Sequence, residues 1–208
     1  MGFAVAAEAA RRGHDVTLIT GPVVLKTPKG VKRIDVVSAR EMLKVVDEVL
    51  SHATGMSRPL CCDTQRRRDI PVAFISTAAV ADWRPAKCAT SKLKKRQMSG
   101  TLKLVRNPDI LKTINHHRPT SNLQPSTLHL IGFAAETDDV LAEASRKCRE
   151  KGLSFIVAND VTEKGSGFGT DTNRVTFVFS DGTLKRHPLM SKRRVAGAII
   201  REIEGLAK

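Results

Sequence analysis

The sequence predicts an α/β fold in which a mostly parallel sheet carries helices on both faces. Short, nearly continuous apolar segments recur along the 208 residues, which is typical of strands buried on both faces of a parallel sheet. Helix-forming stretches lie between these segments, and this alternation favours parallel strands joined by crossover helices. Near the C-terminus the alternation gives way to a hairpin pattern. With 41% hydrophobic residues, the chain can build one sizeable core.

The first elements follow from local composition. Phe3 to Arg12 is rich in alanine and is followed by Gly13, so we expect a helix that ends at the glycine. Asp15 to Thr20 is predicted to be a strand buried on both faces, and Val31 to Val37 a less buried strand. Ala39 to Ser51 is expected to form the next helix.

The remaining elements repeat the same alternation, which completes the prediction of a Rossmann-like three-layer fold. Further buried strands are expected at Val72 to Ser76, Leu128 to Phe133 and Leu153 to Ala158, and a short strand at Leu102 to Val105. Helices are expected at Pro108 to His116, Asp138 to Lys151 and Ser191 to Leu206. Arg174 to Phe179 and Leu184 to Arg186 flank Asp181-Gly182, a strong signal for a β-hairpin. Ala53 to Asp69 and Arg118 to Thr127 have the composition of polar surface loops.

The order of the first two elements predicts that the domain, residues 1–208, is incomplete at its N-terminus. A helix that feeds a buried parallel strand normally completes a β-α-β unit, in which an earlier strand and a tight loop precede the helix. We therefore expect the first strand and loop to be missing. Such loops hold phosphate, because free backbone N–H groups and the helix dipole point there. The missing segment is thus an expected ligand site.

Charge and aromatic content bear on the class of partner. The net charge of +14 indicates either an anionic partner or a role in solubility. Aromatic residues make up only 4% of the chain and tyrosine is absent, which disfavours the stacking surfaces that bind nucleic acid. We interpret the basic runs Arg66 to Arg68 and Lys192 to Arg194 as solvated surface.

Cysteine usage and hydropathy indicate the compartment. Cys61, Cys62, Cys88 and Cys148 form no C-x-x-C pair, so we expect reduced thiols, and the histidines show no ligand spacing for zinc. No metal-ligating residue is assigned. No apolar run approaches the roughly 20 residues of a membrane-spanning helix. A cytoplasmic protein without a membrane partner is the expectation.

Candidate ligand contacts lie where the buried strands end, because ligands of open α/β sheets bind outside the carboxyl ends of the strands. After the strand at Val72 come Ser76, Thr77, Ala78 and Ala79, which are small enough for a ligand to approach closely, and Asp82, a fixed acceptor for an amino-bearing base. The next buried strand ends near Phe133, which offers a flat apolar face. The last ends at Asn159 and Asp160.

The run Lys92-Leu93-Lys94-Lys95 admits two interpretations. The three lysines could converge on a triphosphate and stabilise charge that develops during phosphoryl or nucleotidyl transfer. Alternatively, they form a solvated edge kept basic so that it does not pair with another strand. Spacing alone favours the second interpretation.

Two further groups of residues have both a structural role and a candidate ligand-binding role. Lys147 and Lys151 share one face of their predicted helix, where a solvated face is the default. Asn107-Pro108-Asp109-Ile110 is expected to start a helix, with Asn107 as the cap and Pro108 at the first helical position.

Five of these motifs together resemble phosphopantothenoylcysteine synthetase. They occur in the order of that family: Ala78 to Asp82, Lys92 to Lys95, Asn107 to Ile110, Gly132 to Thr137 and Ala158 to Val161. With the segments named next, the resemblance spans nearly the whole chain. Met1 to Arg12, Val16 to Pro22 and the later Gly167, Phe168, Asp171, Asn173 and Arg174 are also similar to it.

The resemblance implies a ligase of coenzyme A biosynthesis. Bacterial members join 4'-phosphopantothenate to cysteine with CTP, through an acyl-cytidylate and with release of pyrophosphate, and magnesium assists. By this resemblance Ser76, Thr77, Ala78 and Asp82 would surround the cytosine, and Asn107, Pro108, Asp109, Ile110 and Phe133 would make further nucleotide contacts. Lys92 would be catalytic and meet the phosphates, with Lys147 and Lys151 nearby. Ala79, Lys94, Lys95, Asn159 and Asp160 would bind substrate or support those that do.

The family also differs from this chain. Its members carry a strand, a glycine-containing loop and an Asn-x-Ser-Ser-Gly-Lys-like stretch just before the position of Met1, and many continue upstream into a flavin-dependent decarboxylase. FMN is expected only where that half is present. The loops Met56 to Asp69 and Thr120 to Ser126 depart from the family pattern. A homodimer is implied by the family.

Other functions stay open at this point. The chain could be a catalytically inactive nucleotide-binding or dimerisation fragment of such a ligase. A basic nucleic-acid binder would show steeply salt-dependent affinity for polynucleotide. A dinucleotide oxidoreductase is disfavoured because no G-x-G-x-x-G lies between a strand and a helix. The sequence does not fix CTP over ATP.

Overall fold

The computed structural model describes residues 1–54, 70–92, 94, 100–117, 128–136, 139–160 and 169–207. The helices are α1 (Gly2–Arg11), α2 (Ala39–Ala53), α4 (Ile110–His117), α5 (Val140–Glu150) and α6 (Lys192–Leu206). The strands are β1 (Val16–Thr20), β2 (Val31–Asp35), β3 (Val72–Ile75), β4 (Trp83–Pro85), β5 (Leu104–Arg106), β6 (Leu128–Glu136), β7 (Phe155–Asp160), β8 (Thr172–Asn173), β9 (Val175–Phe179), β10 (Leu184–Arg186) and β11 (Met190–Ser191). The predicted loop Ala53 to Asp69 begins too early, because Ala53 is the last residue of α2 and Thr54 caps it. The rest of that loop, with Cys61, Cys62 and Arg66 to Arg68, and the loop Arg118 to Thr127 lie outside the described residues, as do Gly167 and Phe168.

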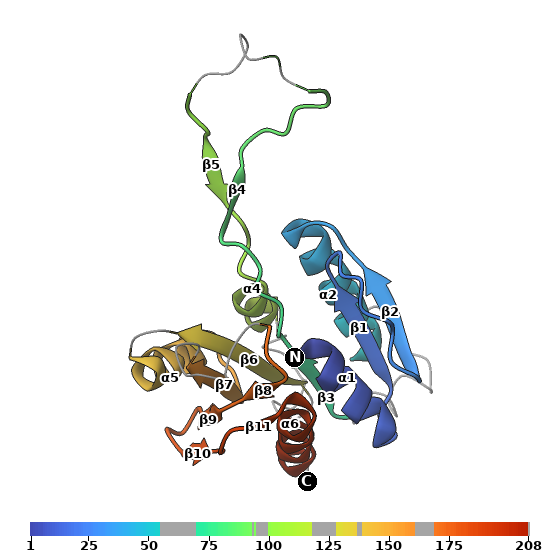
Figure 1. The fold of residues 1–208 in the computed structure, drawn as a ribbon, viewed down its shortest axis with the longest axis vertical. Coiled ribbons are helices and arrows are strands. Elements are labelled where there is room, and N and C mark those ends of the chain that lie inside the picture. The colour runs from blue at the N-terminus through green and yellow to red at the C-terminus, as the bar shows by residue number, and fades with distance from the viewer. Residues whose placement is uncertain are drawn as a thin grey trace.

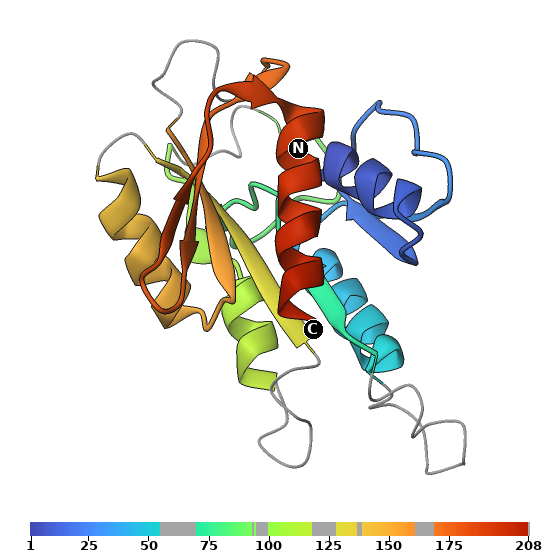
Figure 2. The ribbon, with the colours of Figure 1, turned by 90° about the horizontal axis from the view of Figure 1, so that it is seen from below.

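A five-stranded sheet in the order β10-β9-β7-β6-β3 forms the centre of the molecule. β3, β6 and β7 are parallel, with Val72 opposite Leu128 and Ile131 opposite Phe155, and β9 and β10 continue the sheet antiparallel. Helices cover both faces (Figures 1 and 2). The predicted α/β fold with a mostly parallel sheet and a C-terminal hairpin is confirmed.

One face of the sheet packs against the first and last helices of the chain. Side chains from β6, β7 and β9 meet α1 and α6 in a buried cluster that includes Ile131, Phe155, Phe177, Val195 and Ile199. Figure 2 shows α6 running across the sheet beside α1. Each buried aliphatic or aromatic side chain stabilises the fold by about 1.5–3 kcal/mol relative to its exposed state. The two ends of the sequence therefore build one layer.

The other face packs against α2, α4 and α5. Leu130 and Ile156, the neighbours of Ile131 and Phe155, point to this face because side chains alternate along a strand. They meet Ile114 of α4 and Cys148 of α5, both buried. Burial raises the pKa of the Cys148 thiol, which fits the reduced, structural cysteine expected from the sequence.

β1 and β2 form a parallel pair of their own, with Val16 opposite Val31. The prediction that β1 is buried on both faces is wrong: only Thr20 is buried, and the other side chains are half-buried. Within the described residues β1 pairs with β2 alone and β3 with β6 alone, and the prediction of a buried strand is also wrong for β3, where Ala73 is exposed and the other side chains are half-buried. A strand without a neighbour on one edge keeps more solvent contact.

A narrow arm extends from the body between β3 and α4. β4 and β5 pair antiparallel at its base, with Trp83 opposite Arg106, and Figure 1 shows the arm reaching far beyond both layers. The Arg106 guanidinium lies over the Trp83 ring, 5.1 Å from its centre. β5 is the short strand predicted at Leu102 to Val105, displaced by one to two residues, whereas β4 was not predicted.

Candidate functional site

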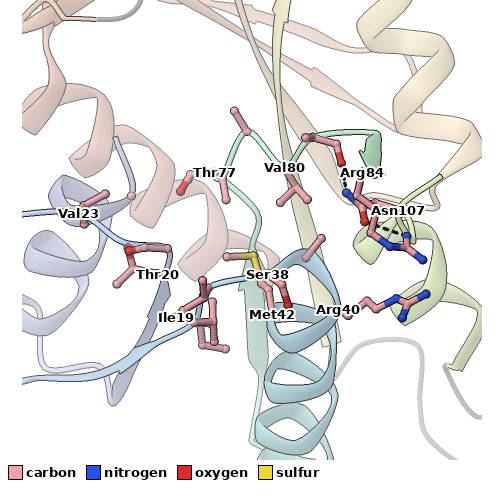
Figure 3. Close-up of a pocket in the computed structure, with 18 of the residues that line it drawn as sticks. Ile19, Thr20, Val23, Ser38, Arg40, Met42, Thr77, Val80, Arg84 and Asn107 are labelled. Atoms are coloured by element: carbon pink, nitrogen blue, oxygen red, sulfur yellow. Dashed lines mark hydrogen bonds between the residues drawn. The ribbon is translucent and has the colours of Figure 1, made fainter. Parts of the chain in front are cut away.

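A cavity of about 650 Å³ opens at the carboxyl ends of β1, β2 and β3. Figure 3 shows its walls, which come from four parts of the chain. The described lining residues are Gly2 and Phe3 of α1, Leu18 to Gly21 with Val23, Val36 to Arg40 with Met42, and Thr77 to Ala81 with Trp83 to Pro85 and Asn107. The location is the one that the strand-end argument predicts for a ligand.

Small side chains after β3 allow α1 and this segment to approach each other closely. A Cβ atom added to Gly2 would lie 2.5 Å from Thr77 Oγ1, so the first turn of α1 requires glycine here. Thr77, Ala78 and Ala79 line the cavity beside it. Three residues of one predicted motif therefore reach the same cavity wall.

Asn107 ties this segment to the base of the arm. Its Nδ2 donates to the carbonyl of Ala81 at 2.7 Å, and its backbone N–H donates to the carbonyl of Asp82 at 2.7 Å. Its Oδ1 accepts from Nη1 of Arg84 at 3.0 Å (Figure 3). Because the amide side chain already makes these bonds, Asn107 fixes the cavity wall whether or not it also contacts a ligand.

The predicted start of the following helix is wrong by two residues. α4 begins at Ile110, and Asp109 rather than Asn107 caps it: Oδ1 of Asp109 accepts from the backbone N–H of Lys112 at 3.1 Å. Pro108 thus precedes the helix instead of occupying its first position. The amide of Asn107 is engaged at the arm, which leaves the capping role to the next suitable side chain.

Asp109 and Lys151, both predicted to contact nucleotide, pair with each other at 2.9 Å. Burial alone would raise the pKa of Asp109, but the bonds from Lys151 and from the Lys112 N–H outweigh it, and the pKa lies below its ordinary value. Lys147 is half-buried one turn earlier on α5. This pair belongs to the α4–α5 side of the sheet rather than to the cavity lining.

The basic run lies on the arm. Lys92 and Lys94 are exposed there, and Lys95 lies outside the described residues. Neither described lysine is among the residues that line the cavity. Whether this run acts on a triphosphate stays a prediction.

The other candidates lie around the sheet at varied depth. Ser76 donates its N–H to the carbonyl of Ile131 at 2.9 Å, and Asp82 is exposed. Phe133 is half-buried against the core, whereas Ile110 and Asn159 are buried. The side chain of Asp160 is outside the described set. Of the sequence candidates, Thr77, Ala78, Ala79 and Asn107 line the cavity.

Sequence reasoning missed several lining residues. Arg40 enters from the first turn of α2 and Arg84 from β4, and both carry positive charge to the cavity. Phe3 and Val23 form part of its apolar wall. The rule that ligands lie at the carboxyl ends of strands would have found Val23 and Arg40 had it been applied to β1 and β2 as well.

Within the described residues, no helix is long and apolar enough to cross a membrane. In that same part of the chain, no group of three or more His, Cys, Asp or Glu side chains gathers as potential metal ligands. The function of the site is therefore argued from the residues that line the cavity and from their charges.

Comparison with protein families decides the affiliation. Residues 1–206 match the family described as the DNA/pantothenate metabolism flavoprotein C-terminal domain. The chain belongs to this family. A relative in Vibrio vulnificus (strain CMCP6), the coenzyme A biosynthesis bifunctional protein CoaBC, is 42% identical over 208 residues, which are 99% of this chain and 46% of that protein. The chain thus spans about half the length of the curated relatives it matches.

Solved structures of the flavoprotein C-terminal domain family share the fold. The crystal structure of the C-terminal domain of CoaBC superposes with a TM-score of 0.71 at 32% identity, over 99% of this chain and 81% of that chain. A mutant of Cab2 in complex with phosphopantothenate-cysteine superposes with a TM-score of 0.53 at 14% identity, over 99% and 77%, which supports the fold alone.

Proposed function

We propose that this chain carries the ligase step of coenzyme A biosynthesis, in which 4'-phosphopantothenate and cysteine are joined at the expense of CTP. The observation that carries the proposal is the convergence on one cavity at the strand ends of Ala78, Ala79 and Asn107, from two of the five motifs, with Thr77 just before the first motif. The 42% identity to CoaBC supports it across the whole chain. The mutant of Cab2 that was solved in complex with phosphopantothenate-cysteine shares the fold.

The proposed reaction has two balanced steps. A carboxylate oxygen of 4'-phosphopantothenate attacks the α-phosphorus of CTP, the bond to the bridging oxygen breaks, and pyrophosphate leaves. The cysteine amine then attacks the acyl carbon of the acyl-cytidylate, CMP leaves, and the nitrogen loses a proton to solvent. Both steps are faster when the reactants are held close together in the right orientation. Positive charge near the phosphates also lowers the barrier of the first step.

The residue roles in this proposal follow the motifs. Ser76, Thr77, Ala78 and Asp82 read the cytosine, while Asn107 to Ile110 and Phe133 contact the rest of the nucleotide. Lys92 balances the negative charge that develops on the α-phosphoryl group. Lys147 and Lys151 add to the positive electrostatic potential around the nucleotide. The exposed position of Lys92 on the arm fits a side chain that closes on the ligand, since a long flexible stem carries its charge.

Magnesium, CTP specificity and assembly belong to the same proposal. Mg²⁺ keeps several water ligands and is usually bound through substrate phosphates with one or two carboxylates. No carboxylate is among the described residues that line the cavity, so the CTP phosphates and water would hold most of its coordination shell. The ion would supply charge neutralisation at the phosphates. We further infer a cytoplasmic homodimer, and we assign no FMN site to this domain.

Pyrophosphate release tests the proposed function. The purified chain is incubated with Mg²⁺, 4'-phosphopantothenate and either CTP or ATP, with and without cysteine. Release that requires 4'-phosphopantothenate and prefers CTP is expected, and cysteine should add phosphopantothenoylcysteine to the products. A folded chain that binds CTP without releasing pyrophosphate would instead support the inactive nucleotide-binding fragment.

Two lysines of the arm give a matched control for the assay. Lys92→Met should lower kcat about 10²-fold or more, because it removes charge stabilisation in the transition state. Lys103→Met removes a lysine that is also exposed on the arm but lies outside the motif, and it should leave kcat within about twofold. Equal effects of the two changes would contradict the role proposed for Lys92.

A further inference from the structure

The side chain of Arg33 on β2 joins three segments behind the cavity wall. Its Nη1 donates to the carbonyl of Leu25 at 2.7 Å, and its Nη2 donates to the carbonyl of Val23 at 3.2 Å. Nε and Nη2 also donate to Oδ1 of Asp35 at 2.9 and 2.6 Å. The Arg33 side chain is 19% exposed, whereas the side chain of its partner Asp35 is 62% exposed.

The same guanidinium also contacts α1. It lies over the ring of Phe3, 5.7 Å from the ring centre, in the geometry of a cation–π contact. Phe3 and Val23 both line the cavity although they come from different segments. Arg33 therefore holds two pieces of the cavity wall without being one of the lining residues.

An arginine suits this position better than any other side chain. A guanidinium has five N–H donors in a rigid plane, which lets it bond two carbonyls and a carboxylate while its face lies on a ring. A lysine ammonium has three donors on a flexible stem and cannot match that arrangement. Loss of Arg33 would leave the carbonyls of Val23 and Leu25 without these donors.

The wall held in this way is the apolar part of the cavity. Phe3, Val23, Leu18, Ile19 and Val36 line it, whereas the polar groups of Thr77, Arg84 and Asn107 lie toward the segment after β3 and the arm. Figure 3 shows Ile19 and Val23 on the side away from Arg84 and Asn107. An apolar wall suits a branched aliphatic chain and offers nothing to a triphosphate.

We propose that Arg33 is a positioning residue that fixes Phe3 and Val23 as the surface on which the branched aliphatic part of the acyl substrate packs. This inference rests on the proposed function, which supplies 4'-phosphopantothenate as that substrate. Arg33 touches neither the substrate nor the nucleotide. It acts by holding the wall in the shape that the substrate requires.

Steady-state kinetics of Arg33→Lys give the main test. The KM for 4'-phosphopantothenate should rise about tenfold, the range expected when apolar packing in a pocket is lost, while kcat and the KM for CTP stay within about twofold. Lys32→Met, an exposed neighbour on the same strand, should change none of these. Unchanged constants, or a parallel rise in both KM values, would overturn the inference.

A second variant covers the case in which Arg33→Lys does not fold. Val23→Thr keeps the shape of an exposed side chain and replaces one methyl group by a hydroxyl, so the fold should persist while the wall becomes less apolar. It should raise the KM for 4'-phosphopantothenate in the same way. An unchanged KM for 4'-phosphopantothenate in this variant would also contradict the proposal that the substrate packs on this wall.

Equilibrium binding separates this inference from the proposed function. Trp83, the one tryptophan of the sequence, lines the cavity, so its fluorescence can follow a titration with 4'-phosphopantothenate in the absence of CTP. If the native chain binds but releases no pyrophosphate, the ligase proposal fails and weaker binding by Arg33→Lys, about tenfold, still supports the wall. Equal binding by both, or no binding by the native chain, would overturn the inference.

Discussion

Glu204 of α6 connects the two helices that cover one face of the sheet. Its carboxylate accepts hydrogen bonds from Nε of Arg12 at 2.8 Å and from Nε2 of His14 at 2.9 Å, and Nη2 of Arg12 also donates to it. The bonds from Arg12 and then from His14 lower the pKa of Glu204 from 4.5 to about 2. Because the folded-state pKa is depressed, the stabilisation is present above pH 4.5 and is lost as the pH falls toward 2.

Glu204→Gln is expected to destabilise the protein only where the carboxylate is ionised. The free energy of unfolding should fall by about 0.5–1 kcal/mol at pH 7, the modest range of a partly exposed ion pair. Urea unfolding at several pH values checks this. The difference between the two proteins should shrink steadily from pH 5 to pH 3, and a difference independent of pH would show that Glu204 acts through packing.

At the same scale, the candidate site was partly predictable. Thr77, Ala78 and Ala79 were expected at the cavity because the chain must leave a parallel strand at its carboxyl end, where ligands bind. The role of Arg33 could not be seen in the sequence. An alternating strand pattern gives only the face of the residue, whereas its partners at positions 3, 23 and 25 are set by how α1 and the loop fold back.

The end of α5 shows how a single backbone position closes an element. Gly152 adopts a φ of +60°, and the backbone N–H of Leu153 after it donates to the carbonyl of Cys148 at 3.0 Å, which ends the helix in the Schellman manner. A Cβ atom at this glycine would lie 2.6 Å from Nδ2 of Asn115 on α4. Both the dihedral angle and the neighbouring helix therefore require glycine.

Gly152→Ala should lower the free energy of unfolding by about 1–2 kcal/mol, the cost of a left-handed conformation for a residue with a Cβ atom, before any contribution from Asn115. Gly205→Ala provides the opposite case within α6. Nothing lies within 4 Å of its added Cβ atom, so alanine should stabilise the helix by about 0.5–1 kcal/mol. Thermal or urea unfolding of both variants distinguishes them. If the free energy of unfolding changed in the same direction in both variants, this account would be refuted.

Elements with a regular pattern were predicted well, and short ones were not. The hairpin β9–β10 follows from Asp181-Gly182, where Gly182 has a φ of +88° and Oδ1 of Asp181 accepts from the N–H of Thr183 at 2.8 Å. Strand β4 has three residues and contains Pro85, too little for a period-2 pattern to emerge. Its pairing with β5 depends on the arm as a whole.

At the scale of the whole molecule, the arm carries several exposed apolar side chains. Trp83, Leu102 and Leu104 are 50%, 68% and 48% exposed on the arm, which projects beyond the body of the molecule (Figure 1). Exposed apolar side chains that gather on one projecting element indicate a surface for association. The inferred homodimer would bury them, and the arm is the surface we expect it to use.

Leu102→Ser combined with Leu104→Ser should convert the homodimer to a monomer while the far-ultraviolet circular dichroism stays unchanged, because neither side chain belongs to the core. Sedimentation at several protein concentrations measures the change. Lys103→Ser, between the two leucines, serves as the matched control and should remain dimeric. A native chain that sediments as a monomer at every concentration would disprove the assembly.

The contact between α1 and α6 has a consequence for the newborn chain. Arg12 and Glu204 are separated by 192 positions, and the buried side chains of α6 complete the layer that α1 begins. At a synthesis rate of roughly 5–20 residues per second, the first helix waits about 10–40 s for the last. During translation this apolar face of the sheet is thus covered only in part until α6 has been synthesised.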